Sequence, residues 1–350
     1  MLFSGSKNVV GLDIGSSSLK LVELSESRRG VRLENLALVP LPPEAIVDGM
    51  VQDAQVVTDA IKELVASQKL KGRLVATSVS GHSVIIKKIT LPAMSQKELE
   101  ESIQWEAEQY IPFDIHDVSL DFQILGPSHT PDQMDVVLVA AKKEMVDEYV
   151  AVLSRGGLKP AVMDVAVFAI ENMYEANYSV DEQEVVALIN VGASFTNINV
   201  LKGRESVFTR DLAAGGNRVT AELQKELSLP FQEAEAVKCG KGAGVDPAQA
   251  EPVIRMAASV LATEAQRCLD FFSITSSDER VQRIYLSGGC VRLPSFQAAI
   301  EEKTGCPVET LNPFSRISVD EKQFDLDYVG EMAPLAAVGV GLALRRFGER

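Results

Sequence analysis

The chain has 350 residues, of which 46% are hydrophobic and 24% are charged, so it is long enough to bury two domain cores. Its formal net charge of −15 argues against a nucleic-acid partner, because phosphate binding requires clustered Lys and Arg. No apolar run reaches the roughly 20 residues of a membrane span, no signal peptide is recognised, and four scattered cysteines indicate a reducing compartment. These features predict a cytoplasmic protein.

In chain order, hydrophobic periodicity and turn residues first predict alternating strands and helices. One helix has an apolar face formed by Val57, Ile61 and Leu64, and another begins at a capping box of Ser95 and Glu98. The predicted elements are strands over 9–25, 31–40, 74–79, 84–92, 118–125 and 134–141, and helices over 54–68, 95–109, 143–155 and 165–178.

Beyond residue 184 the pattern starts again with strands and then becomes helical. Paired glycines open one helix at Gly215 and Gly216, and another pair, Gly288 and Gly289, follows a buried strand before a helix expected to open at Pro294. A plain strand-to-helix connection explains the second pair equally well. A loop over 240–247 divides a helical segment over 231–273, and a last helix over 333–347, rich in alanine and glycine, suits close packing between two lobes.

Two stretches half a chain apart share one pattern. GLDIGSSSLKLVEL, from Gly11, aligns without a gap on LINVGASFTNINVL, from Leu188, at an offset of 177 residues. In each stretch an apolar strand ends in a short polar residue, turns on glycine and enters a second strand. Two similar halves facing one another would bring both turns to one ligand. For the first stretch alone, a serine-rich hairpin turn without a ligand is the alternative interpretation.

The residues of these turns suit a phosphate group held together with Mg²⁺. A turn of glycine and small residues exposes successive N–H groups to an anion. The carboxylate of Asp13 would repel phosphate directly, but it suits a hydrated cation, and Mg²⁺ is usually held by one or two carboxylates together with substrate phosphates. Lys20 supplies a positive charge that can reach the same phosphates.

In this order, DIGSSSLK, NVGASFTN, GGNRVTAEL, AEAVK and LSGGCVRLP resemble the nucleotide-binding motifs of the actin/hexokinase/Hsp70 superfamily. Within it the chain is similar to FtsA-like proteins, and most of all to the PilM family of type IV pilus assembly proteins, through LPAMSQKELEESIQWEAEQYIPFD over 91–114. The similarity covers essentially the whole chain. It implies an α/β, actin-like (ribonuclease H-like) two-lobed ATPase fold with an FtsA/PilM-type inserted β-α-β-β-α subdomain.

The resemblance also implies domain limits and a ligand. The first lobe would comprise 1–83, 160–183 and 325–350, the inserted subdomain 84–159, and the second lobe 184–324, with 229–274 as its smaller helical subdomain. ATP and Mg²⁺ would bind between the lobes, with Asp13 ordering Mg²⁺ through water. The nucleotide-binding residues carried over by position are Asp13, Gly15, Ser16, Ser17, Ser18 and Lys20 in the first phosphate motif, Asn190, Gly192, Ala193, Ser194 and Thr196 in the second, Gly215 and Gly216 at phosphate or ribose, Glu235 and Lys238 beside ribose and adenine, and Gly288 and Gly289 at the adenosine floor.

One position departs from the superfamily pattern. The second phosphate motif usually begins with Asp, and here Asn190 stands in its place. An amide can accept a hydrogen bond from metal-bound water, but it has no charge and cannot take up a proton as a carboxylate would. The substitution should weaken Mg²⁺ binding and water activation more than nucleotide binding. The sequence therefore predicts ATP binding with weak or absent hydrolysis and assigns no catalytic residue.

The resemblance further implies a scaffold of the type IV pilus, or a related secretion system, at the inner face of the inner membrane. Its partner would be a PilN-like membrane protein, whose cytoplasmic N-terminal peptide docks beside the inserted subdomain; the pilus motor ATPases are further candidate partners. Membrane association is expected only through the partner. A docked peptide needs a groove with apolar pockets, and its candidate wall is Tyr110, Ile111, Pro112 and Phe113. Packing of these four residues between the insert and the first lobe is an equally good interpretation.

Two alternatives belong to other functional classes. An enzyme of the same superfamily, such as a sugar kinase or an ATPase, would need a base deep in the cleft, and no candidate base stands out. An FtsA-like protein that forms filaments would polymerise with ATP. Rapid ATP turnover would identify the enzyme, and ATP-dependent sedimentation would identify the filament.

Overall fold

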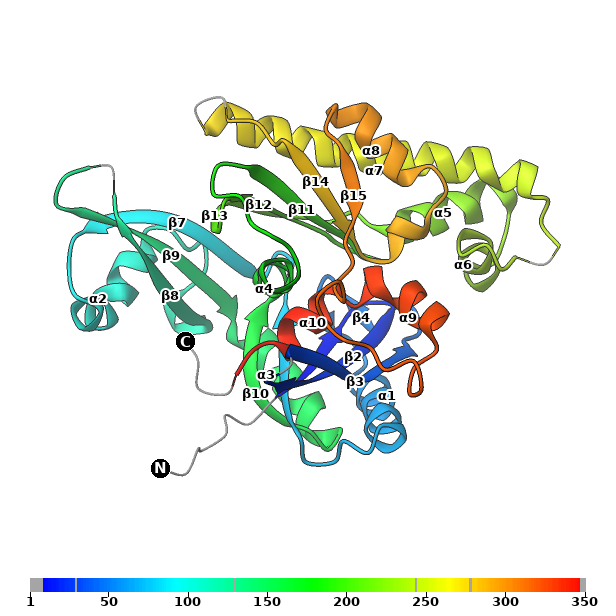
Figure 1. Cartoon of the computed structure of the whole chain (residues 1–350), viewed down its shortest axis with the longest axis horizontal. Helices are drawn as coiled ribbons and strands as arrows, with labels where there is room; N and C mark the ends of the chain where they lie inside the picture. Colours follow the sequence, from blue (N-terminus) through cyan, green and yellow to red (C-terminus); the bar gives the residue numbers. More distant parts are fainter. Residues whose placement is uncertain (1–8, 29, 129, 243, 277–278, 347–350) are drawn as a thin grey trace.

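The structure, a computed structural model, describes residues 9–28, 30–128, 130–242, 244–276 and 279–346 (Figure 1). Ala243 of the predicted loop, Phe347 at the predicted end of the last helix, and the N-terminal residues examined for a signal peptide up to residue 8 lie outside these ranges. The described chain forms two lobes, each built on a five-stranded sheet, and a smaller three-stranded sheet. In Figure 1 the second lobe lies above the first, the insert lies at the left, and α4 and α10 lie between the two large sheets.

The first sheet has the order β10-β6-β1-β2-β3, and helices cover both of its faces. Val10, Leu12 and Ile14 point toward one helix pair, and Val9 and Val22 point toward the other, because successive side chains of a strand alternate between faces. The strands are β1 (Val10–Ile14), β2 (Ser18–Ser27), β3 (Gly30–Pro40), β6 (Leu74–Val79) and β10 (Lys159–Val165); α1 (Ala54–Ser67) and α3 (Lys143–Arg155) cover one face, and α4 (Ala166–Asn177) and α10 (Ala337–Ala343) the other. The two short strands β4 (Ile46–Val47) and β5 (Met50–Val51) form a separate ribbon.

The second sheet repeats this plan with the order β13-β12-β11-β14-β15. In β11, Val185, Ala187 and Ile189 pack toward the helical subdomain, while Val186 and Leu188 join the core that contains α4 and α10. The strands are β11 (Val185–Val191), β12 (Thr196–Lys202), β13 (Glu205–Leu212), β14 (Arg283–Ser287) and β15 (Val308–Thr310); the helices are α5 (Gly216–Leu227), α6 (Phe231–Lys238), α7 (Pro247–Thr275) and α8 (Phe296–Thr304).

The insert has a core of its own. Its sheet runs in the order β7-β9-β8, and α2 packs on it through Leu99 and Ile103. The predicted capping box is present, since Ser95 and Glu98 each bond to the other's backbone amide. The elements are β7 (Val84–Pro92), α2 (Gln96–Glu108), the short helix η1 (Ile115–Asp117), β8 (Val118–Pro127) and β9 (Gln133–Lys142). The next helix, α3, packs against α1 in the core of the first lobe.

Two of the predicted helices differ from the structure. The last helix is interrupted: α9 (Leu326–Met332) and η3 (Ala333–Leu335) precede α10, which ends at Ala343 and is therefore shorter than predicted. Pro334 cannot donate a helical hydrogen bond, which accounts for the short turn there. The helix after Gly288 and Gly289 begins at Phe296, beyond the short helix η2 (Gly289–Arg292), and not at Pro294. Strand β10 was not predicted at all.

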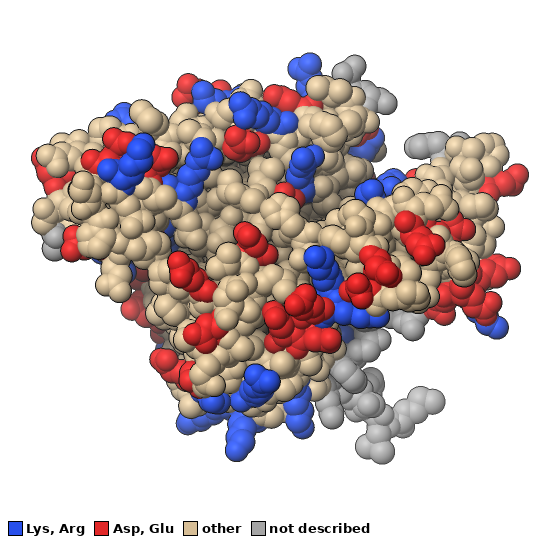
Figure 2. Space-filling view, turned by 180° about the vertical axis from the view of Figure 1, so that it is seen from behind, with Lys and Arg blue, Asp and Glu red and all other residues tan. Residues whose placement is uncertain are grey.

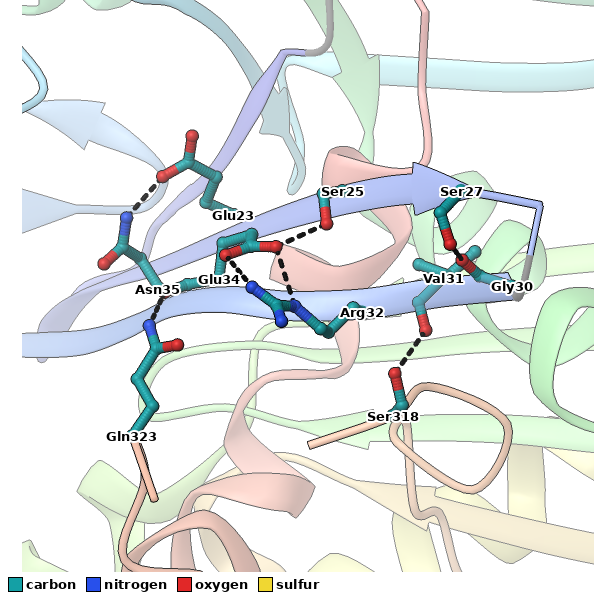
Figure 3. A network of polar contacts seen from close by, with 10 residues as sticks. All are labelled: Glu23, Ser25, Ser27, Gly30, Val31, Arg32, Glu34, Asn35, Ser318 and Gln323. Carbon is teal, nitrogen blue, oxygen red and sulfur yellow. Dashed lines mark hydrogen bonds and ion pairs between the residues drawn. The ribbon is translucent and has the colours of Figure 1, made fainter. Parts of the chain in front are cut away.

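The segment between β15 and α9 runs back from the second lobe along β3, the edge strand of the first sheet (Figure 3). Ser318 pairs with Arg32 as an isolated parallel bridge, and its hydroxyl donates to the carbonyl of Val31 at 3.2 Å. The side chain of Gln323 donates to the carbonyl of Glu34 at 2.8 Å. Because edge strands present unpaired backbone groups, this covering protects β3 from pairing with other chains.

The lobes also meet through α4. The ring of Tyr174 on α4, that of Tyr178 directly after α4 and that of Tyr285 on β14 have centroids 5.2 Å from one another. Nearby, the amide of Asn199 on β12 donates to the carboxyl of Glu171 on α4 at 2.8 Å. Burial raises the pKa of Glu171 to about 7, with the neighbouring carboxylates of Glu175 and Asp164 adding to the shift. These contacts fix α4 against the second sheet.

Among the described residues no single helix is long and apolar enough to cross a membrane; one pair, Leu326–Leu335 with Ala337–Ala343, passes by length and composition but is bent by 89°. On the face shown in Figure 2, Lys and Arg side chains are interspersed with Asp and Glu. This mixed pattern differs from the clustered basic surface that nucleic-acid binding requires.

Candidate functional site

The two stretches that share a sequence pattern form matching hairpins. Asp13 on β1 faces Lys20 on β2, and Asn190 on β11 faces Asn197 on β12, at the same place in each hairpin. The turns match as well, because the amide of Gly15 donates to the carbonyl of Ser18 at 3.1 Å and the amide of Gly192 donates to that of Phe195 at 2.9 Å. The gapless alignment of the two stretches is therefore confirmed by backbone geometry.

Four backbone amides at the tips of these hairpins have no acceptor anywhere in the described ranges. They belong to Ser16 and Ser17 in the first turn and to Ala193 and Ser194 in the second. None of these residues is buried, so the amides can reach a ligand. Successive free N–H groups in a turn form a site for an anion. Ser18 and Thr196, in contrast, are buried at the start of the second strand of each hairpin.

Asp13 and Lys20 form an ion pair in which Nζ lies 3.0 Å from Oδ2. Their side chains are only 17% and 13% exposed, so the pair is well sheltered at the base of the first turn. A cation bound at Asp13 would free Lys20 to contact phosphate. No group of three or more His, Cys, Asp or Glu side chains that could hold a metal occurs in the described part of the chain. Mg²⁺ at Asp13 would therefore depend on water and phosphate for its remaining ligands, as Mg²⁺ usually does.

Asn190 has a different environment from Asp13. Its carbonyl oxygen accepts a hydrogen bond from the hydroxyl of Ser287 at 3.1 Å, and its amide nitrogen donates to Oδ1 of Asn197 at 3.2 Å. Both polar atoms of the side chain therefore have partners in neighbouring strands. Asn190 faces the first lobe, as do Val186 and Leu188 on the same strand.

Gly215 and Gly216 contribute close packing at the start of α5. The amides of Gly216 and Asn217 donate to the carbonyls of Gly192 and Ala193, at 2.9 and 2.8 Å. A Cβ on Gly215 would lie 2.5 Å from the oxygen of Gly192, which no real side chain allows. The amide of Gly216 therefore already has a protein acceptor, and the expectation that both glycines face phosphate or ribose stays a prediction.

An open hollow of about 480 Å³ lies beside the second turn. It is bordered by the turn itself and by the first turns of α5, including the guanidinium-bearing Arg218, which sequence reasoning did not assign to the site. A cation at this place would balance phosphate charge near the amides of Ala193 and Ser194. The full lining is Ala193, Ser194, Ala213, Ala214, Gly215, Asn217, Arg218 and Glu222.

Glu235 and Lys238 join α6 to α5. Nζ of Lys238 lies 2.6 Å from the carboxylate of Glu235, and both side chains bond to the hydroxyl of Thr220. Lys238 is 10% exposed, whereas Glu235 is 34% exposed. Of the two, Glu235 is the more accessible to a ribose.

Gly288 and Gly289 differ in their surroundings. Gly288 has φ of +90°, its amide donates to the carbonyl of Pro334 at 2.7 Å, and a Cβ there would lie 2.4 Å from the oxygen of Val191. Apart from its chain neighbours, no atom of the described residues lies within 4 Å of the Cβ position of Gly289, so this side of Gly289 is open. The next residue, Cys290, is buried, and burial raises the pKa of its thiol to about 12. Gly288 is thus buried against β11, whereas Gly289 is exposed, and the contact of both glycines with adenosine stays a prediction.

The predicted partner wall lies in the insert. Ile111 is 6% exposed and belongs to the core of the insert, against which Tyr110 and Phe113 pack. Pro112 is exposed, and Nζ of Lys142 lies 4.8 Å from the centre of the Phe113 ring. The stretch therefore packs mainly within the insert. Pro112 is exposed and Tyr110 and Phe113 are half-buried, so they remain candidates for the wall of a partner groove, and that groove stays a prediction.

Two facing lobes with matching β-hairpins, with α4 and α10 between their sheets, define the actin-like fold. A solved structure described as MreB5 of Spiroplasma citri bound to ADP shares this fold, with a TM-score of 0.53 and 12% identity over 96% of this chain and 95% of that one.

The chain belongs to the family of type IV pilus assembly protein PilM, whose family model matches residues 11–347. A solved PilM–PilN type IV pilus biogenesis complex contains a chain that is 34% identical, with a TM-score of 0.87, over 97% of this chain and 98% of that chain. Cell division protein FtsA of Neisseria meningitidis serogroup B is 24% identical over 66% of this chain, which corresponds to 60% of the length of FtsA.

Proposed function

We propose that this chain is an ATP-holding scaffold of the type IV pilus assembly platform. It would bind the cytoplasmic N-terminal peptide of a PilN-like inner-membrane protein, and it would reach the inner face of the membrane through that partner. The PilM–PilN complex supports the partner, because 34% identity over 97% of the chain is a full-length similarity. The nucleotide would set the conformation in which the peptide is bound.

The observation that carries the nucleotide assignment is the set of four amides without acceptors, on Ser16, Ser17, Ala193 and Ser194. Both turns can donate to one polyphosphate, Lys20 and Arg218 add positive charge, and the open side of Gly289 offers space for adenosine. Mg²⁺ at Asp13 would neutralise phosphate charge. These groups bind and orient a nucleotide without supplying a base.

Weak hydrolysis follows from the environment of Asn190. Both polar atoms of its side chain bond to protein groups, and an amide cannot accept a proton from an attacking water. A superfamily enzyme would need a carboxylate at this position or elsewhere in the cleft. The geometry therefore favours a protein that retains ATP.

The test is an equilibrium and turnover measurement on the full chain. We expect saturable, Mg²⁺-dependent binding of one fluorescent ATP analogue per chain, and turnover of ATP itself far below the median enzyme rate of about 10 s⁻¹. Bound nucleotide recovered after an hour should still be ATP. Turnover near that median rate, or transfer of phosphate to a small molecule, would identify an enzyme instead.

A further inference from the structure

Four polar side chains form a continuous row across the second sheet. They are Ser287 on β14, Asn190 on β11, Asn197 on β12 and Asp211 on β13, one from each of four neighbouring strands. The strand register places each directly beside the next, since Asn190 pairs with both Ser287 and Asn197, and Asn197 pairs with Asp211. We call this row the polar ladder.

Every hydrogen bond of the polar ladder runs in one direction. Ser287 donates to Asn190, Asn190 donates to Asn197, and Asn197 donates to Oδ1 of Asp211 at 2.7 Å. The direction is fixed by Asp211, because a carboxylate only accepts. Asn197 must therefore present its nitrogen to Asp211 and its oxygen to Asn190. Aligned hydrogen bonds of this kind polarise and strengthen one another in a buried setting.

The ladder explains why an amide occupies position 190. That side chain must accept from Ser287 and donate to Asn197 at the same time, which an amide can do and a carboxylate cannot. An Asp at 190 would set two oxygens against each other, or would turn Asn197 away from Asp211. The two hydrogen bonds of the ladder therefore require an amide side chain at position 190.

Asp211, the last residue of the polar ladder, contacts the first lobe. Oδ2 of Asp211 accepts the backbone amide of Gly81 at 2.6 Å, and Gly81 follows β6 of the first lobe. Burial raises the pKa of Asp211, and the two hydrogen bonds oppose that shift. Beside this contact, the ring of Phe195 at the second turn packs edge-on to His82 with centroids 5.8 Å apart. A Cβ on Gly81, whose φ is +93°, would lie 2.9 Å from the Phe195 ring.

Gly81 stands at the base of the insert. The amide of Val84, the first residue of β7, donates to the carbonyl of Gly81, and the amide of Lys142, at the end of β9, donates to that of Ser83, both at 3.0 Å. The ammonium of Lys142 in turn lies over the ring of Phe113 in the predicted partner wall. Contacts therefore run without a break from the second phosphate turn to the stretch proposed to meet the peptide.

We infer that the polar ladder couples nucleotide at the second turn to the orientation of the insert, with Asp211 as the positioning residue at Gly81. This inference rests on the proposed function, since it needs both ligands. A phosphate drawn to the amides of Ala193 and Ser194 shifts the hairpin that carries Asn190, Phe195 and Asn197. The shift reaches Gly81 through Asp211 and through the Phe195 ring, and nucleotide and peptide then alter each other's affinity by the same factor.

The test is a binding cycle on the full chain with a synthetic peptide of the PilN-like N-terminus and Mg·ATP. In the wild type, Mg·ATP should strengthen peptide binding about tenfold. The measured quantity is the ratio of the peptide Kd without Mg·ATP to the peptide Kd with it. Asp211→Asn places a donor where an acceptor is needed, so this ratio should fall to within about twofold of one. The affinity for nucleotide itself should change less than about threefold. The matched control is Glu205→Gln, on the same strand, because Glu205 contacts Lys88 of the insert at 2.6 Å outside the ladder. It should keep the wild-type ratio.

A second variant tests the proposal if Asp211→Asn does not fold. Ser287→Ala removes the donor at the opposite end of the ladder and should reduce the ratio by at least about half. An unchanged ratio in both variants would overturn the coupling, as would a wild type that binds both ligands independently. A wild type that binds no nucleotide would reject the proposed function itself, and the two failures are thus distinguished.

Discussion

Asp13→Asn should lower the affinity for Mg·ATP by about 10- to 100-fold, which is the usual cost of removing a residue that orders metal-bound water. The variant keeps the size and shape of the side chain and removes only its charge. Asp13 lies 3.0 Å from Lys20 at the base of the first turn, where both are sheltered from water. Because the variant leaves the sheltered charge of Lys20 without its partner, it should also lose some folding stability, and the affinity is compared at a temperature where both proteins are folded.

Mg²⁺ should change the ATP affinity of the wild type and of Asp13→Asn differently, and this difference identifies Asp13 as the metal anchor. Without Mg²⁺ the carboxylate of Asp13 repels phosphate, so the variant should bind free ATP at least as tightly as the wild type. With Mg²⁺ only the wild type should gain affinity. Titration with a fluorescent ATP analogue, once with Mg²⁺ present and once with a chelator, measures the affinity in both conditions.

Asp59→Asn is a suitable control for the Asp13 variant. It also removes one member of an Asp–Lys pair, with Lys62 at 2.9 Å, but on the exposed surface of α1. Its ATP affinity should equal that of the wild type. If Mg²⁺ strengthened ATP binding equally in Asp13→Asn and the wild type, Asp13 would not be the metal anchor.

Gly341→Ala should destabilise the whole chain by about 3 kcal/mol, near the upper end of overpacking costs. A Cβ at Gly341 would lie 1.6 Å from the carbonyl oxygen of Ala169, where α10 crosses α4. Backbone atoms cannot turn aside as a flexible side chain would. The helices must therefore separate, and they belong to the core that both large sheets share.

Gly330→Ala makes the same chemical change in α9, where no described residue outside the helix's own backbone lies within 4 Å of the added Cβ. There alanine should raise the free energy of unfolding by up to about 1 kcal/mol, because it lowers the entropy of the unfolded chain. Urea unfolding of both variants gives the comparison. Equal stabilities would contradict the close crossing of α10 and α4.

Much of the fold was predictable because its signals are local or repeated. The capping box at Ser95, the helix ending before Gly156, and the two hairpins are each specified within a few residues. The repeat added long-range information, since two similar turns had to be placed in similar halves. Strand β10 was missed because its seven residues lie between two helices and lack a clear alternating pattern.

The parts of the site that escaped prediction depend on contacts between distant residues. Asp211 accepts a hydrogen bond from Gly81, which is 130 positions away in sequence, and nothing in the sequence around Asp211 indicates that partner. Asn190 could be recognised as unusual from sequence, but the reason for it lies in Ser287 and Asn197 on adjacent strands. The acceptor of the Gly216 amide, the carbonyl oxygen of Gly192, is likewise distant in sequence.

The most direct test of the scaffold proposal is the affinity of the full chain for a labelled peptide of the PilN-like cytoplasmic N-terminus, measured by fluorescence anisotropy. The sole tryptophan, Trp105, lies exposed on α2 of the insert and gives a second signal from the protein itself. We expect saturable binding of one peptide per chain that is strengthened by Mg·ATP, with no binding of a scrambled peptide. Equal binding of the two peptides, or no binding in either nucleotide state, would contradict the proposal.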